Sequence, residues 1–344
     1  MIFFEAKSNI LFGDNGSGKT NILESISMIS KGRGFRNANI VDLIKNNNEG
    51  FLIGSTLEID NNNYNIEIQS KKIDDKYKKI VNLNDDSSKE NQTFLNSKLS
   101  YLIFLPEMER LFQSSPSYRR NFIDRLIFSE HKDYNKLINK YKKNITERTK
   151  ILQQYKIDES WINYVENQIS EIGLKIYEIR NTQINILNKH ISILNKINTY
   201  DFSVNLILKD SFFYDNLTKE SYLAQLIQNR DYDRKFGGIK IGPHKSDLVG
   251  KINNEFDASQ LSTGQQKTVV LMILLAQCNY LINTVNVKPI LLLDEICSHL
   301  DKNNRKILLD LINQFDIQLF LTGTEKTLFS FISTNVKFYN ITEL

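Results

Sequence analysis

Cysteine and long apolar runs are scarce in this chain. Only Cys278 and Cys297 are cysteines among its 344 residues, which excludes a disulfide framework and a cysteine-based zinc motif. No apolar run approaches the roughly 18 residues that span a membrane, and the first residues lack the pattern of a secretory signal. We therefore expect both thiols to pack in a core, and we expect a cytoplasmic protein without a membrane partner.

Proline is also rare, and none lies between Pro116 and Pro243. Apolar residues recur in this stretch at the three-to-four spacing of an amphipathic helix, which predicts a helical lobe of roughly 70 residues with the apolar stripe as its core. The stripe comprises Ile162, Val165, Ile169, Ile172, Ile176, Ile179, Leu187, Ile191 and Leu194. The alternation of Val204, Leu206 and Leu208 then predicts a strand that returns to the main sheet.

Charge of one sign does not dominate the composition. The formal net charge is +4, with 24% charged and 41% hydrophobic residues, as in ordinary globular proteins. This mildly basic balance is compatible with a nucleic-acid partner. Alternating residues predict strands at Phe51 to Ile59 and Tyr64 to Ile68. The polar residues 70–92 predict a hairpin tip or a mobile loop.

What the chain does contain is a complete phosphate-binding loop. Residues 13–20 have the sequence GDNGSGKT, which fills every fixed position of the pattern G-x-x-x-x-G-K-S/T. Glycines allow a tight turn whose N–H groups surround phosphates, the lysine reaches the β- and γ-phosphates of ATP, and the threonine hydroxyl binds Mg²⁺. The residues expected to contact the nucleotide are Gly13, Asp14, Asn15, Gly16, Ser17, Gly18, Lys19, Thr20 and Asn21.

The flanks of the loop have the required pattern. Ile10 to Phe12 is a short apolar run that predicts a strand entering the loop. Ile22, Leu23, Ile26 and Ile29 recur at helical spacing and predict the helix that follows. The alternative is a chance match to the pattern in an ordinary glycine turn. Such a turn would not need a strand before it and a helix after it.

A second nucleotide motif lies near the C-terminus. Residues 289–295 read PILLLDE, an apolar run followed by two carboxylates, which predicts a buried parallel strand whose carboxyl end meets the nucleotide. Asp294 is placed to hold Mg²⁺, and Glu295 is placed to act as the base that activates the attacking water. The alternative is a strand that ends in two surface carboxylates.

Between these motifs, residues 261–267 read LSTGQQK, which resembles the signature motif of ABC-type ATPases. That resemblance implies that Ser262, Gly264 and Gln265 contact the γ-phosphate held by a partner subunit, as free N–H groups at a helix start suit an anion. The alternative is an ordinary N-cap by Ser262 or Thr263. Residues 298–301 resemble the D-loop of the same superfamily and add Asp301 to the expected site.

Further segments resemble the RecF family, the bacterial ATPases of DNA-gap repair. These are PEMERLFQSSPSYRRNFIDRL at 106–126, GPHKSDL at 242–248 and GRGFR at 32–36. With the nucleotide motifs, the resemblance covers Ile10 to Thr322. It implies an α/β ABC-type P-loop ATPase head, with a mixed sheet, flanking helices and an inserted α-helical lobe. The expected divisions are an ATPase lobe at 1–115 and 201–344 and a helical lobe at 116–200.

The resemblance also implies a function in recombinational DNA repair and replication. Two ATP-bound subunits would dimerise and clamp DNA at single-strand gaps and single-strand/double-strand junctions. Weak DNA-dependent ATP hydrolysis would reset the clamp. The implied partners are RecO and RecR, with RecA loaded indirectly and the SOS response supported. The alternatives are the ATPase subunit of a transporter and an ATPase-like interaction module that does not hydrolyse ATP.

The chain departs from the family in two places. Lys245 and Ser246 replace residues of a GPHRDDL-like segment. Only twelve residues precede Gly13, where RecF proteins carry an N-Y-R-N-like segment, so we expect a mis-annotated start codon.

Basic residues supply candidate contacts to DNA phosphates, which need cations without sequence-specific geometry. The candidates are Lys31, Arg33, Arg36, Arg119 and Arg120. For each of them a solvated surface charge is the alternative. His244 is expected to position its neighbours rather than to bind a metal, because nothing near it in the sequence completes a metal site.

Overall fold

The computed structural model describes the whole chain except residues 1, 5, 30–31, 33, 37, 46–47, 60, 75, 198–202, 214–216, 298–301, 333–334 and 344. The chain forms two compact units, Met1–Glu109 with Leu281–Leu344, and Arg110–Tyr280. The predicted lobes divide the chain after residues 115 and 200 instead. Their assignment as an ATPase lobe and a helical lobe stays a prediction.

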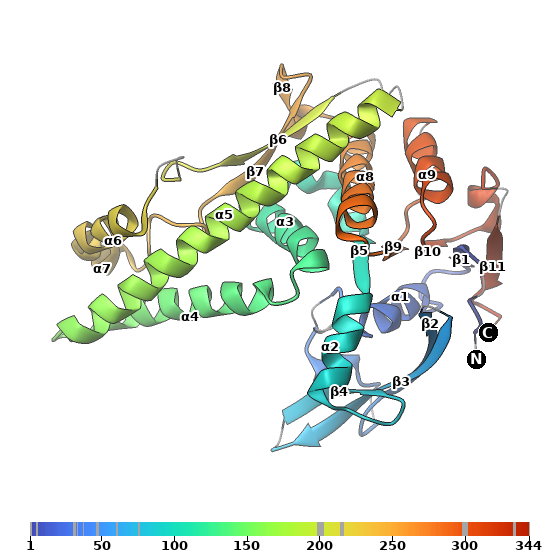
Figure 1. Cartoon of the computed structure of the whole chain (residues 1–344), viewed down its shortest axis with the longest axis horizontal. Coiled ribbons are helices and arrows are strands. Elements are labelled where there is room, and N and C mark those ends of the chain that lie inside the picture. Colours follow the sequence, from blue (N-terminus) through green and yellow to red (C-terminus); the bar gives the residue numbers. More distant parts are fainter. Residues whose placement is uncertain are drawn as a thin grey trace. The chain divides into compact units, whose positions relative to one another are not determined.

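The first unit is built on a five-stranded sheet in the order β11-β1-β10-β9-β5 (Figure 1). Every pairing in this sheet is parallel. Its strands are mostly continuous apolar runs, as expected of a parallel sheet that is covered on both faces. The strands are β1 Ser8–Phe12, β5 Ser100–Phe104, β9 Pro289–Leu293, β10 Leu319–Gly323 and β11 Val336–Asn340.

The predicted strand and helix around the phosphate loop are confirmed, because β1 leads into helix α1, Lys19–Ser27. The α/β class is also confirmed. The expected mixture of strand directions is not found within the sheet that carries the loop. Antiparallel strands occur instead in two separate three-stranded sheets among the described residues.

A separate antiparallel sheet of the first unit contains β2 Leu52–Ile59, β3 Asn62–Ile73 and β4 Lys76–Leu83. The polar residues after Ser70 form most of the β3–β4 hairpin, with Ile73 paired to Lys76 at its tip. The predicted hairpin is therefore confirmed, whereas much of the expected loop is paired strand. The remaining helical segments of the unit are η1 Ile40–Leu43, α2 Lys89–Lys98, α9 Lys302–Gln314, η5 Lys326–Phe329 and the start of η2 Pro106–Gln113.

The second unit is dominated by helices, as the apolar spacing in the proline-free stretch between Pro116 and Pro243 predicts. Helix α5, Glu159–Ile197, is 39 residues long and contacts α4, α6 and α8 of the same unit (Figure 1). The predicted apolar stripe of α5 is buried except for Ile179, which is half-buried. The other helices are α3 Pro116–Glu130, α4 Tyr134–Leu152, α6 Lys219–Gln228, α7 Arg230–Phe236, η3 Ala258–Gln260 and α8 Thr263–Tyr280.

The strand predicted from Val204, Leu206 and Leu208 exists as β6, Val204–Lys209, but it does not return to the main sheet. It pairs antiparallel with β7, Asp247–Ile252, in a sheet completed by β8, Phe256–Asp257. Val204 and Leu206 are buried on the side that packs on α5. Alternation reports which face of a strand is buried, and it does not report which sheet the strand joins.

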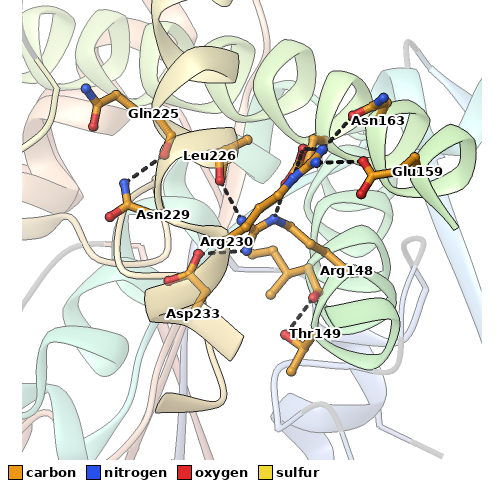
Figure 2. A network of polar contacts seen from close by, with 11 residues as sticks. Arg148, Thr149, Glu159, Asn163, Gln225, Leu226, Asn229, Arg230 and Asp233 are labelled. Atoms are coloured by element: carbon orange, nitrogen blue, oxygen red, sulfur yellow. Dashed lines mark hydrogen bonds and ion pairs between the residues drawn. The ribbon is translucent and has the colours of Figure 1, made fainter. Parts of the chain in front are cut away.

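A charged network inside the second unit joins three of its helices (Figure 2). Arg148 of α4 donates to Glu166 of α5 at 2.8 Å and to Asp233 of α7 at 2.7 Å, and all three side chains are at most 1% exposed. Arg230 of α7 also donates to Glu166, at 2.5 Å. Buried charges need such partners because their transfer from water is costly.

Helix α8 continues as η4, Leu281–Val285. Together they form the stretch Thr263–Val285, which is long and apolar enough to cross a membrane, but 78% of its apolar window is buried inside the structure. A buried core helix passes the same test, so this stretch is weak evidence for a membrane span. Cys278 and Cys297 are both buried, as predicted.

Candidate nucleotide site

The phosphate loop leaves the sheet at Gly13, in a backbone conformation that requires glycine. Gly13 has a φ of 143°, and a Cβ at this position would overlap the Oγ1 atom of Thr342. That hydroxyl accepts a 2.9 Å hydrogen bond from the backbone N–H of Asp14. Ile341 donates its N–H to the carbonyl of Phe12 at 2.8 Å. The segment after β11 therefore fixes the start of the loop.

Lys19 is folded back over the loop. Its Nζ atom donates to the carbonyls of Gly13 and Asp14, both at 2.7 Å, and the residue is only 6% exposed. A compact ammonium held on loop carbonyls lies where a phosphate chain would need a cation. The Oγ atom of Ser17 is buried and has no hydrogen-bond partner among the described residues. The loop therefore contains an unsatisfied polar atom that a polar ligand can satisfy.

Helix α1 begins in a manner that suits an anion. Its N-cap is Gly18, with a φ of 100° and no capping side chain, and its first turn contains no acidic residue. The first N–H groups of a helix have no partner within the helix, and the helix dipole places partial positive charge there. Gly16, with a φ of 83°, makes the preceding turn. The start of α1 is therefore available to bind phosphate.

The two predicted carboxylates lie directly after β9, as expected. Asp294 is 4% exposed, and its N–H donates to the carbonyl of Phe104 in β5 at 2.9 Å. Its Oδ1 atom accepts hydrogen bonds from Thr20 at 3.2 Å and from Thr322 at 2.6 Å. Glu295 is exposed and has a φ of 48°. The phosphate loop and the carboxylates therefore meet through the hydroxyl of Thr20.

Parallel pairing explains this meeting. Phe12 of β1 pairs with Gly323 of β10, and Leu321 of β10 pairs with Leu293 of β9, so the carboxyl ends of all three strands lie at one edge of the sheet. Ligands of open α/β sheets bind at that edge. Thr322 belongs to the same edge, although no motif in the sequence predicts it as a site residue. The available signal was an apolar run, Leu319–Leu321, that ends in a hydroxyl residue.

The segment that resembles the signature motif opens α8 in the second unit. The Ser262 hydroxyl accepts from the Gln265 N–H at 3.4 Å, and the Gln265 Oε1 atom accepts from the Ser262 N–H at 3.0 Å. This reciprocal arrangement is a capping box, so the N-cap predicted as one alternative is present. Both side chains are exposed, as contact with a partner subunit would require. The D-loop segment, with Asp301, lies outside the described residues.

The two family-like segments of the second unit bind each other. Arg119 donates to both carboxylate oxygens of Asp247 at 2.7 Å, and Arg120 donates to the carbonyl of Ser246 at 2.7 Å. The Arg119 side chain is 12% exposed. Its charge is therefore committed to an internal ion pair, which disfavours it as a DNA contact. The bidentate geometry is the strong form of such a pair.

Of the other three candidate DNA contacts, Arg36 alone lies within the described residues. Arg36 donates to the side-chain oxygen of Asn21 at 3.4 Å, close to the start of α1. Lys31 and Arg33 lie outside the described residues.

His244 holds neighbouring groups together. Its Nε2 atom lies 3.0 Å from the carbonyl of Ile239, and its Nδ1 atom lies 3.1 Å from the hydroxyl of Tyr141. Burial, with a smaller contribution from the charges of Lys245 and Arg120, lowers the pKa of His244 to about 4. No group of three metal-binding side chains occurs within the described residues. These contacts agree with the predicted positioning role.

Comparison with known families identifies the chain. Residues 1–343 match the family model described as "RecF/RecN/SMC N terminal domain". The chain is 33% identical over 319 residues to "DNA replication and repair protein RecF" of Rickettsia massiliae (strain Mtu5), covering 92% of this chain and 87% of that protein. The RecF protein of Rickettsia felis (strain ATCC VR-1525 / URRWXCal2) is 32% identical over 320 residues, with 92% and 86% covered.

Solved structures agree with this assignment. "Structure of the recombination mediator protein RecF-ATPrS in RecFOR pathway" matches with a TM-score of 0.82 and 25% identity, covering 99% of this chain and 92% of the other. The corresponding RecF-ATP structure matches with a TM-score of 0.78 and 26% identity, covering 99% and 93%. An Smc head domain from Pyrococcus yayanosii shares the fold alone, with a TM-score of 0.52, 13% identity and coverage of 98% and 90%. The chain belongs to the RecF family of DNA replication and repair proteins, and its fold is that of the RecF and SMC ATPase heads.

Proposed function

We propose that this chain is an ATP-dependent DNA-binding protein that acts as a dimer. ATP would bind at the phosphate loop, two subunits would close around the nucleotides, and the closed dimer would clamp DNA. Hydrolysis would open it. The observation that carries this proposal is the convergence of Lys19, Thr20, Asp294 and Glu295 at one edge of the parallel sheet.

The loop fits the phosphates of ATP. Lys19 would exchange its two loop carbonyls for the β- and γ-phosphate oxygens, which are stronger acceptors because they are charged. The N–H groups at the start of α1 would bind the same anions, and the buried hydroxyl of Ser17 would gain a partner. The two RecF structures named above, one described with ATP and one with ATPrS, support this part of the proposal.

The carboxylate edge fits the requirements of hydrolysis. Thr20 and Asp294 would hold Mg²⁺, which supplies positive charge to the phosphates. Glu295, which is exposed beside them, would orient the attacking water and accept its proton. We expect slow turnover that is stimulated by DNA.

Dimer closure would involve the start of α8. Ser262, Gly264 and Gln265 would contact the γ-phosphate bound by the other subunit, and Asp301 would lie nearby. The exposed side chains of Ser262 and Gln265, and their position at the positive end of the α8 helix dipole, support this role.

The biological role that we propose follows from the family. The clamp would act at single-strand gaps and single-strand/double-strand junctions in the cytoplasm. RecO and RecR would be its partners, RecA loading its outcome, and the SOS response one consequence. The description of the matched structures within the RecFOR pathway supports these partners.

The test is the DNA affinity of Glu295→Gln with and without Mg-ATP. This variant should bind ATP and stall before hydrolysis, so the clamped state accumulates. Fluorescence anisotropy with gapped and with fully paired DNA, at one stated salt concentration, measures the affinity, since phosphate contacts depend steeply on salt. We expect ATP to strengthen binding to gapped DNA several-fold, consistent with a coupling of roughly 1 kcal/mol or more.

The matched control is the double variant Lys19→Ala/Glu295→Gln, which should bind DNA equally with and without ATP. If ATP leaves the DNA affinity of Glu295→Gln unchanged, an ATP-gated clamp is wrong for this chain. The interaction module without hydrolysis would then describe it better.

A further inference from the structure

Thr322 is the buried hydroxyl residue at the carboxyl end of β10. It is 0% exposed, and β10 lies between β1, which enters the phosphate loop, and β9, which ends just before Asp294. A buried hydroxyl next to a reactive carboxylate needs partners, because leaving it unsatisfied is costly. Its partners are both part of the candidate nucleotide site.

One hydroxyl binds two consecutive residues of the site. The Oγ1 atom of Thr322 donates to Oδ1 of Asp294 at 2.6 Å, and it accepts from the backbone N–H of Glu295 at 2.7 Å. Both roles are available to a hydroxyl at once, since it has one proton and two lone pairs. The bond to the carboxylate is in the short range that is typical of charge-assisted hydrogen bonds.

The second of these bonds holds an unfavourable backbone conformation. Glu295 has a φ of 48°, the left-handed region that side chains with a Cβ rarely adopt. Such a conformation persists only where surrounding contacts enforce it. The N–H of Glu295 is fixed by Thr322, so the direction in which the chain turns after β9 depends on this hydroxyl.

The first bond supports the link to the phosphate loop. Oδ1 of Asp294 also accepts from Thr20, at the longer distance of 3.2 Å. Thr322 therefore holds the carboxylate from the sheet side while Thr20 reaches it from α1. A side chain held on two sides keeps one orientation, which a ligand of Mg²⁺ requires.

We propose that Thr322 is a positioning residue for ATP hydrolysis. Its hydroxyl orients the Asp294 carboxylate toward Thr20 and fixes the backbone turn that carries Glu295. The role rests on the proposed ATPase function, and it requires the hydroxyl group and not merely the shape of the side chain.

The test compares Thr322→Val with Thr322→Ser. Valine keeps the branched shape and removes the hydroxyl, whereas serine keeps the hydroxyl. We expect kcat of Thr322→Val to fall about 10- to 100-fold, as when an outer partner of a metal ligand is lost. Thr322→Ser should retain most of kcat. A fluorescent ATP analogue should bind all three proteins with the same Kd, since the loop and Lys19 are untouched, and half-maximal turnover of Thr322→Val should require more Mg²⁺.

The outcomes separate this inference from the proposed function. If the unmodified protein neither binds the analogue nor hydrolyses ATP, the proposed function fails, and this inference fails with it. If the unmodified protein does both and Thr322→Val matches its kcat, the inference alone is wrong. It is also wrong if serine lowers kcat as much as valine does, or if valine weakens analogue binding as much as it slows hydrolysis. Thermal unfolding of each variant shows whether the protein tested is folded.

Discussion

At the scale of single residues, His244 illustrates how burial determines the protonation state of a side chain. The carbonyl of Ile239 can only accept, so the Nε2 atom of His244 must donate. Burial lowers the pKa of His244 to about 4, so the ring is neutral at neutral pH. A neutral ring with its proton on Nε2 accepts the hydrogen bond of the Tyr141 hydroxyl at Nδ1.

The pH dependence of stability should reveal this neutral ring. The unfolded chain protonates His244 near its ordinary pKa of about 6.5, whereas the folded chain does so only near 4. Between these values the unfolded state binds more protons, so the free energy of unfolding falls as the pH falls. Urea denaturation at pH 7 and pH 4.5 should show a loss that is about 2 kcal/mol larger in the unmodified protein than in His244→Gln. Equal losses in the two proteins would contradict this assignment.

At the scale of elements, the helices of the second unit are joined by charge as well as by apolar contact. Glu166 of α5 accepts from Arg148 of α4 and from Arg230 of α7. Arg148 also donates to the carbonyl of Leu226 at 2.7 Å (Figure 2). The Arg148 side chain that makes these bonds is fully buried. The angle at which these helices meet therefore depends on directional bonds.

Replacing Arg148 should destabilise the unit strongly. Arg148→Met keeps much of the volume and leaves Glu166 and Asp233 buried with too few partners. Breaking a buried pair in this way costs about 3–5 kcal/mol, which urea unfolding followed by circular dichroism would measure. The matched control is Lys175→Met on the neighbouring helix α5, because the Lys175–Glu171 pair is exposed and should contribute little. If both variants lose a similar free energy of unfolding, the buried network stabilises the unit no more than the exposed pair does.

At the scale of the whole molecule, the phosphate loop and the segment that resembles the signature motif belong to different compact units. Lys19 belongs to the unit with the parallel sheet, and Ser262 belongs to the unit with the long helices. A site completed by a second subunit would use the phosphate loop of one chain and the start of α8 of the other. Binding of ATP and dimerisation should therefore be separable by mutation.

Two substitutions should separate them. Lys19→Ala removes the main phosphate cation and should lose both ATP binding and ATP-driven dimerisation. Ser262→Arg adds a bulky side chain at the start of α8, so it should block dimerisation while ATP affinity stays unchanged. Sedimentation velocity with ATP, beside nucleotide affinity for each variant, measures both properties. Normal dimerisation of Ser262→Arg would rule out the arrangement in which α8 meets the partner's nucleotide.

The sequence by itself determined the features whose causes are local. The glycine pattern of the phosphate loop, the apolar run before Asp294 and the stripe on α5 each depend on residues that are neighbours in the chain or lie within one helical turn. Steric freedom at glycine and helical periodicity act over that distance, so these features could be predicted.

Only the tertiary structure decided which distant residues meet. It placed β6 beside β7 rather than in the main sheet, and it joined Arg119 to Asp247, 128 positions away in the chain. It also brought Thr322 to the two carboxylates after β9. A strand or a charge can satisfy its bonds with many partners of the same chemistry, and the packing of the whole chain selects among them.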